Sequence, residues 1–162
     1  MKVEVVRSPR RRKTITAERR EGKVVVRLPA GMSRTEERTW VHRMVTRITE
    51  QERVQRLNAR RTLESTATRL NRDYFDGRLR WQSIRYVGNQ RDRYGSCTPV
   101  DGAIRISDRV AGWPIWVREY IVMHELAHLL VPSHSARFWK LVERYPMTER
   151  ARGFLYAKGW DG

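Results

Sequence analysis

The chain has 162 residues, of which 40% are hydrophobic, so it is long enough to fold as one domain, residues 1–162, around its own core. Its single cysteine, Cys97, excludes an internal disulfide and a CxxC zinc ribbon, and no apolar run reaches the roughly eighteen residues that span a bilayer. Since the first residues also contain no apolar signal segment, these features predict a soluble, cytoplasmic protein without a membrane partner.

The chain is strongly basic, with a formal net charge of +16 and a pI of about 11.2. Residues 1–64 contain 18 Lys or Arg against 8 Asp or Glu. The densest basic patch is formed by Arg7, Arg10, Arg11, Arg12 and Lys13. Such a patch can contact phosphate backbones or acidic protein surfaces, which makes nucleic acid a candidate partner of the N-terminal half. The charge is equally consistent with a solvated surface.

Three short strands are predicted near the N-terminus, at residues 3–7, 14–19 and 23–28. Glu21-Gly22 is suited to a tight turn between the last two strands. The sequence therefore predicts a basic β-hairpin region.

Two helices are predicted after this region. Ser33 and Glu36 form a capping box, and apolar residues spaced three or four apart predict a helix over residues 34–57. A second helix is predicted over residues 61–75, separated from the first only by polar sequence. Phe75-Asp76-Gly77 then ends the helical region.

Between residues 80 and 110 the sequence period changes to two, which predicts antiparallel strands. An extended peptide can pair with a free strand edge, and the candidate edges are residues 95–98 and 104–107. The alternative is an ordinary sheet core without a role in substrate binding. The candidate substrate-binding residues on these strands are Gly95, Ser96, Ile104 and Ile106.

The segment MHELAHLL, residues 123–130, contains an HExxH motif on a predicted helix that begins near Pro114. His124 and His128 are four residues apart, so both imidazoles project from one helix face and can bind one metal ion. Glu125 can then lie beside the metal and take a proton from a zinc-bound water, as in metalloproteases with this motif. HExxH also arises by chance, but three of the four histidines of this chain fall within eleven residues.

The candidate third ligand is His134, since a hydrolytic zinc usually has three protein ligands and an open fourth position. Pro132 disfavours helical backbone at Val131, so the helix should end near Leu130 and let the chain return to the ion. A continuous helix would instead carry residue 134 about 9 Å further along its axis. The predicted cofactor is one Zn²⁺ ion, bound by His124, His128 and His134.

A further helix is predicted over residues 136–144, with Ser135 at its N-cap. Phe138 and Trp139 are expected to pack behind the metal-binding helix. A second donor to the oxyanion of a tetrahedral intermediate would assist hydrolysis, and the sequence does not choose among several candidates. These candidates are Arg144, Tyr145 and Tyr156.

Taken together, these motifs resemble the YgjP-like metallopeptidase family. The resemblance rests on Tyr94-Gly95-Ser96-Cys97, the strand at 104–107, Pro114, residues 120–128, His134-Ser135 and Phe138-Trp139. Residues 70–79 are also similar to the helix before the sheet in the related SprT and Spartan group. The resemblance implies a small zincin in which Glu125 is the catalytic base and the ligands are His124, His128 and His134.

Two departures limit what the related groups imply. SprT and Spartan proteins bind DNA and cut proteins trapped on it, often with the help of a cysteine zinc ribbon, which this chain lacks. In metzincins a glycine stands three residues after the second histidine, where this chain has Val131. Neither a DNA-repair role nor metzincin membership therefore follows.

The sequence predicts an α+β fold. We expect a small zincin-like domain with a β-hairpin region (1–31), two long helices (32–77), and a small antiparallel sheet with the metal-binding helices (78–162). The predicted function is hydrolysis of peptide bonds in a peptide or protein substrate, with a zinc-activated water and Glu125 as general base. Two alternatives stay open: a nucleic-acid-associated protein, either a protease recruited to DNA or a binding module with structural zinc, and a zinc amidase acting on a non-protein amide.

Overall fold

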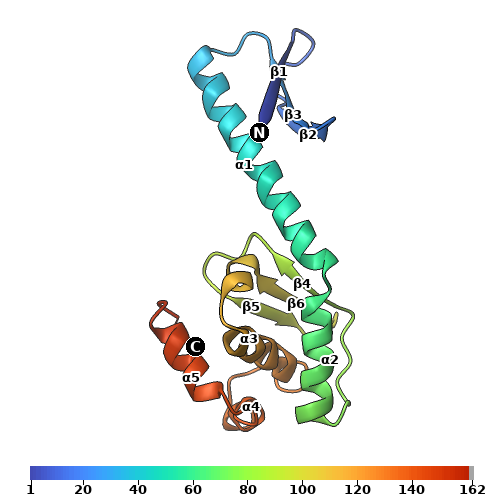
Figure 1. Cartoon of the computed structure of the whole chain (residues 1–162), viewed down its shortest axis with the longest axis vertical. Coiled ribbons are helices and arrows are strands. Elements are labelled where there is room, and N and C mark those ends of the chain that lie inside the picture. The colour runs from blue at the N-terminus through green and yellow to red at the C-terminus, as the bar shows by residue number, and fades with distance from the viewer. Residues whose placement is uncertain (161–162) are drawn as a thin grey trace. The chain divides into compact units, whose positions relative to one another are not determined.

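The computed structural model describes residues 1–160, which divide into two compact units, Met1–Arg53 and a second unit that begins at Val54 (Figure 1). The division falls within one helix, α1 (Arg34–Ala59). Each unit has its own hydrophobic core. None of the helices within residues 1–160 combines the length and the apolar character needed to cross a membrane.

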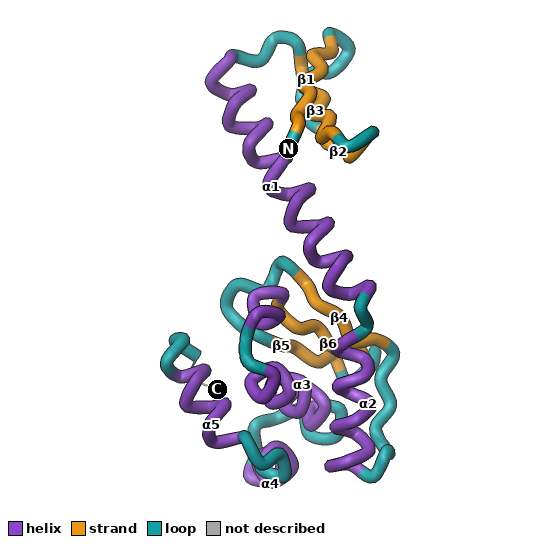
Figure 2. The backbone as a smooth tube through the Cα atoms, viewed as in Figure 1, coloured by secondary structure: helices purple, strands orange, loops and turns teal. Residues whose placement is uncertain are grey.

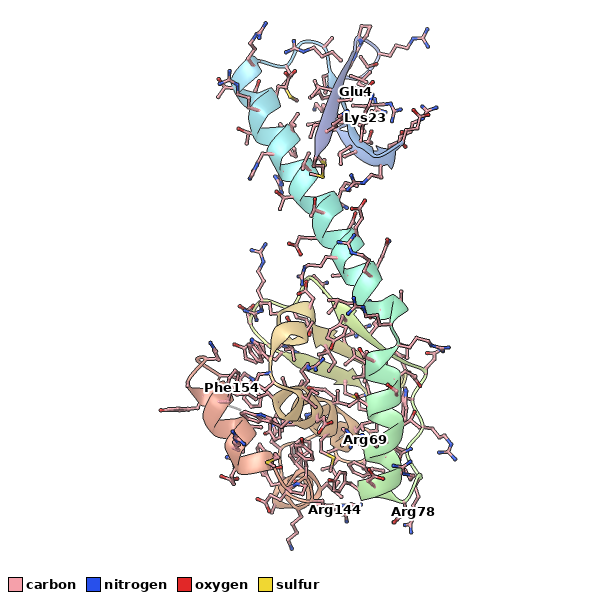
Figure 3. The ribbon with its side chains drawn as sticks, in the orientation of Figure 1. Glu4, Lys23, Arg69, Arg78, Arg144 and Phe154 are labelled. Atoms are coloured by element: carbon pink, nitrogen blue, oxygen red, sulfur yellow. The ribbon has the colours of Figure 1, made fainter. Side chains whose placement is uncertain are left out.

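The sheet of the first unit has β3 (Lys23–Pro29) at its centre, with β1 (Lys2–Ser8) parallel to it and β2 (Thr16–Arg20) antiparallel to it. Glu21 and Gly22 form the turn between β2 and β3, and both have positive φ angles, 48° and 78°. The pair Glu4–Lys23, with charged atoms 3.6 Å apart, joins β1 to β3 (Figure 3). The predicted strands are confirmed, and β2 and β3 form the hairpin.

The N-terminal part of α1 packs on this sheet through its predicted apolar stripe. The capping box is present, because Ser33 Oγ accepts from the Glu36 amide at 3.3 Å and Glu36 Oε2 accepts from the Ser33 amide at 3.1 Å. The core side chains of β3 are fully removed from solvent, and burial of each stabilises the fold by roughly 1.5–3 kcal/mol. The residues in this core are Val24, Val26 and Leu28, covered by Val41, Met44, Val45 and Ile48.

The sheet of the second unit places β6 (Ala103–Ser107) between β4 (Ser83–Val87) and β5 (Gly95–Thr98) (Figure 2). β5 pairs antiparallel with β6, as predicted, whereas β4 pairs parallel with it. β5 therefore forms an edge of this sheet. The predicted edge at residues 104–107 is wrong, because β6 is paired on both sides and the side chains of Ile104 and Ile106 are fully buried.

The centre of the second unit is α3 (Ile115–His128), which contacts β5, β6 and the other helices of the unit. Its residues from Tyr120 to Ala127 are all buried, so the metal motif lies on a helix that is fixed by the core. The sequence predicts α2 and α4 but neither α5 nor the short 3₁₀ helix η1. These elements are α2 (Thr62–Phe75), α4 (Ala136–Val142), α5 (Thr148–Tyr156) and η1 (Asp108–Gly112).

The ends of α2 are set by residues in the left-handed region. Arg61, with φ 51°, separates α2 from α1, and Asp76 and Gly77, with φ 54° and 68°, end it. The amides of Asp76 and Gly77 both donate to the carbonyl of Asn71, which satisfies the last turn. The predicted separation into two helices is confirmed.

Candidate metal centre and active site

The three histidines of the motif region converge at the end of α3. α3 ends at His128, and the amides of Leu129, Leu130 and Val131 donate back to carbonyls of its last turn. Pro132 follows, and the chain turns so that His134 returns to the helix. The Nε2 atoms of His124 and His134 are 3.0 Å apart, and one ligand atom from each of the three histidines lies within 4.8 Å of the others.

The donor set fits a metal ion of the zinc type. Burial, and then the neighbouring His128 and His134, lower the pKa of His124 to about 3, so its imidazole is neutral and has a lone pair to offer. Burial also lowers the pKa of His128. Two nitrogens bound to one tetrahedral zinc lie about 3.3 Å apart, close to the separation seen between His124 and His134. The described residues therefore form a metal-binding histidine cluster.

Main-chain contacts at the end of the helix orient the second histidine. Nδ1 of His128 lies 3.1 Å from the carbonyl oxygen of Val131, so the ring can donate there and keep Nε2 for a metal. His124 differs, because its Nδ1 is buried and has no hydrogen-bond partner among residues 1–160.

Aromatic rings pack around the cluster, as the sequence predicts. Phe138 of α4 stacks on His128 with ring centroids 4.4 Å apart, and its edge meets His124 and His134 at 4.8 Å. Trp139 stacks on His134 with an interplanar angle of 24°. Ser135 caps α4 by accepting from the Phe138 amide at 3.4 Å, so the residue after the third histidine starts the helix that holds these rings.

Glu125 lies next to the histidines and is buried, with 5% of its surface exposed. Burial raises the pKa of its carboxyl group to about 8, an effect that the positive charge of Arg93 opposes. A dication in the histidine cluster would lower this pKa again. The carboxyl group packs against Gly95 of β5, where a side chain would have no space. Glu125 is thus held between the edge strand and the helix, in the cavity that the three histidines also line.

A cavity of about 710 Å³ opens over the cluster. Residues of β5, with the segment before it, form one wall, and α3 forms another. Of the four candidate substrate-binding residues, Gly95 and Ser96 lie on this wall, whereas Ile104 and Ile106 are absent from the lining. Cys97 lies there as well, and burial raises the pKa of its thiol to about 12, so it is not a reactive thiolate.

Tyr120 and Trp160 are among the lining residues of this cavity for which the sequence predicts no functional role. Tyr120 lies one helical turn before His124, with ring centroids 6.1 Å apart, and Trp160 lies 5.8 Å from the His124 ring. The apolar spacing of α3 includes Tyr120, so periodicity alone places it in the core. The sequence signal for a functional role is the choice of residue: position 120 carries a tyrosine, although a phenylalanine would fill the core equally well.

The candidate oxyanion donors Arg144, Tyr145 and Tyr156 do not line this cavity. The Tyr145 hydroxyl donates to Glu119 at 2.7 Å, and Arg144 donates to the Tyr74 carbonyl at 2.8 Å, near the end of α2 (Figure 3). Tyr156 is 74% exposed and lines an adjoining hollow, which shares His134 and Trp160 with the cavity. None of the three lines the cavity that holds Glu125.

Comparison with protein families matches residues 52–156 to the YgjP-like metallopeptidase domain. The match lies almost wholly in the second unit, which holds the histidine cluster. Among solved structures, the crystal structure of the metallopeptidase zymogen of Pyrococcus abyssi abylysin is similar, with a TM-score of 0.53 and 22% identity. That similarity covers 60% of this chain and 94% of the abylysin chain, and it shows a shared fold. A comparison with curated proteins found no match.

Proposed function

This chain belongs to the YgjP-like metallopeptidase family, and we propose that it hydrolyses peptide bonds with one bound zinc ion and with Glu125 as general base. The position of Glu125 carries the proposal. A buried carboxyl group stands beside three converging imidazoles, in a cavity large enough for a peptide segment. A purely structural zinc site would need no base and would usually fill its fourth position with a protein ligand.

Three imidazole nitrogens, from His124, His128 and His134, would hold the metal and leave one position open. When bound, zinc would supply a Lewis acid that polarises the peptide carbonyl and lowers the pKa of water. The contact between His128 and the Val131 carbonyl would keep one of these ligands in the correct tautomer.

Glu125 performs the proton transfers in this proposal. It takes a proton from the attacking water, whose oxygen forms the new bond to the carbonyl carbon. It then gives that proton to the leaving nitrogen as the C–N bond breaks, so the products are a carboxyl group and an amine. Burial raises the pKa of Glu125 and a bound dication would lower it, and these opposing effects suit a group that must both accept and return a proton near neutral pH.

The substrate would bind along β5. This strand is an edge of its sheet and contributes Gly95, Ser96 and Cys97 to the cavity wall. An extended peptide that pairs with the strand gains main-chain hydrogen bonds that do not depend on its side chains. Gly95 and Ser96 are therefore the proposed substrate-binding residues.

Metal analysis of purified protein tests the metal site. We expect about one zinc per chain in the wild type and none in His128→Ala. His42→Ala is a matched control, because His42 is the one histidine outside the cluster and lies exposed on α1. Wild-type protein that takes up no zinc would overturn the proposal, as would His128→Ala that keeps it.

A second candidate function concerns the first unit, which lies outside the family match except for its last two residues. Its loop between β1 and β2 gathers Arg10, Arg11, Arg12 and Lys13 around one shallow hollow. Among the described residues, no carboxylate pairs with any of these four side chains. We infer that this loop contacts the phosphate backbone of a nucleic acid and that the peptidase acts on proteins bound to it.

A further inference from the structure

The hydroxyl group of Tyr120 is buried without a hydrogen-bond partner among residues 1–160. The side chain is fully removed from solvent, so water in the bulk does not satisfy it. Yet Tyr120 lines the same cavity as His124, Glu125 and His128. A buried polar group without a partner costs free energy, and a phenylalanine would avoid that cost. We therefore expect the Tyr120 hydroxyl group to gain its hydrogen-bond partner when a ligand binds in the cavity.

A second buried tyrosine shows the ordinary arrangement. Tyr145 is 4% exposed, and its hydroxyl donates to Glu119 at 2.7 Å and lies 3.3 Å from the Trp116 carbonyl. Tyr145 does not line the cavity of the histidine cluster. The two buried tyrosines thus differ: the hydroxyl group of Tyr145 has hydrogen-bond partners, whereas that of Tyr120, a residue that lines the cavity, has none among residues 1–160.

The position of Tyr120 suits a group that acts on the substrate. It stands four residues before His124, so the two side chains lie on one helix face, with ring centroids 6.1 Å apart. Glu125 faces Gly95 of β5, whereas the Tyr120 ring neighbours Trp160. A carbonyl bound at the cluster would therefore have the base and the phenol as separate neighbours within one cavity.

We propose that the Tyr120 hydroxyl donates a hydrogen bond to the carbonyl oxygen of the peptide bond under attack, where negative charge develops. This role rests on the proposed peptidase function. A phenol is a neutral donor, and a fixed donor in a buried site stabilises a developing oxyanion without reorganisation. Arg93 also lines the cavity, but it is exposed and its charge acts on Glu125.

The test compares Tyr120→Phe with Tyr145→Phe, two variants that remove the same atom from buried tyrosines. In denaturant unfolding, we expect Tyr120→Phe to be as stable as the wild type or more so, and Tyr145→Phe to be less stable. With zinc bound, kcat of Tyr120→Phe should fall about 10²- to 10³-fold with KM within threefold, while Tyr145→Phe keeps the wild-type kcat.

Two binding measurements separate this role from others. A peptide phosphinate, which carries a tetrahedral oxyanion, should bind Tyr120→Phe about 10²-fold more weakly than it binds the wild type, and zinc affinity should be unchanged. If zinc affinity falls and excess zinc restores activity, the hydroxyl instead orients His124, whose buried Nδ1 also has no partner in the described chain, and the proposal is overturned.

Activity measurements distinguish the role of Tyr120 from the peptidase function on which it rests. Folded Tyr120→Phe with kcat/KM within threefold of an active wild type would remove the role of Tyr120 and leave the peptidase function intact. Zinc-loaded wild type that cleaves no peptide would remove the proposed function and this role with it.

Discussion

Gly95 lies directly against Glu125, so that a Cβ atom at position 95 would stand 2.8 Å from Glu125 Cγ and Cδ and closer still to Oε1. Real Cβ atoms essentially never approach another heavy atom so closely, so a side chain at this position must displace the carboxyl group. The edge strand that borders the cavity thus also fixes the space in which the proposed base sits.

Gly95→Ala should therefore reduce kcat about 10- to 100-fold, because a base that is moved by about 1 Å loses its alignment with the attacking water. Strand pairing of residue 95 with Ile106 should persist, so the fold should survive. Gly112→Ala is the control, since a Cβ there would meet no atom within 4 Å. Steady-state kinetics of both variants check this, and full activity of Gly95→Ala would contradict the placement of Glu125.

Glu125→Gln should bind zinc as the wild type does and lose activity by several orders of magnitude. The amide has nearly the shape of the carboxyl group but cannot accept the proton of the attacking water. Elemental analysis measures the bound zinc, and single-turnover peptide cleavage measures the loss of activity. Unchanged turnover in a folded, zinc-loaded variant would exclude Glu125 as the base.

In the metal-free protein, His124 should reduce the stability as the pH falls from 6.5 towards 3, while Glu125, whose pKa burial raises to about 8, acts in the opposite direction above pH 4.5. Burial lowers the pKa of His124 from 6.5 to about 3, so His124 contributes stability above pH 6.5 that is lost as the pH falls through about 3. The contribution to the slope reaches about 1.4 kcal/mol per pH unit. Urea unfolding of metal-free protein at several pH values measures it, and His124→Asn should show a shallower slope. Equal slopes would show that His124 is not held neutral by the fold.

The basic loop of the first unit should give salt-dependent binding to nucleic acid. Replacing Arg10, Arg11, Arg12 and Lys13 by glutamine should reduce the slope of log K against log salt, by about 0.9 for each lost phosphate contact on duplex DNA. The control removes four exposed basic residues of the second unit: Arg60, Arg72, Arg78 and Arg137. Fluorescence anisotropy with a labelled duplex measures both variants. Equal slopes would show that net charge, rather than the loop, governs binding.

The convergence of the three histidines could be predicted from sequence because it depends on local rules. Helical spacing brings His124 next to His128, and Pro132 ends the helix so that His134 can return. The capping box of Ser33 and Glu36 is predictable for the same reason. In each case the interacting groups lie within about ten residues of one another, where backbone geometry limits the outcomes.

The arrangement of the strands could not be predicted in the same way. A period of two identifies β6 as a strand but does not say which strands flank it, and β4 reaches it through a parallel pairing. For this reason, the prediction that residues 104–107 form an edge of the sheet is wrong. Similarly, the apolar stripe of α3 contains Tyr120, but periodicity does not reveal whether a buried hydroxyl finds a partner. The extent of a single domain over residues 1–162 stays a prediction, since the family match covers residues 52–156.

The end of α3 makes the metal site cooperative. The same short segment releases the chain so that His134 can reach the cluster and supplies the Val131 carbonyl that orients His128. Two of three ligands thus depend on where one helix stops. A mutation that extended the helix would misplace His128 and His134 at the same time. We therefore expect such a mutation to abolish metal binding rather than to weaken it partly.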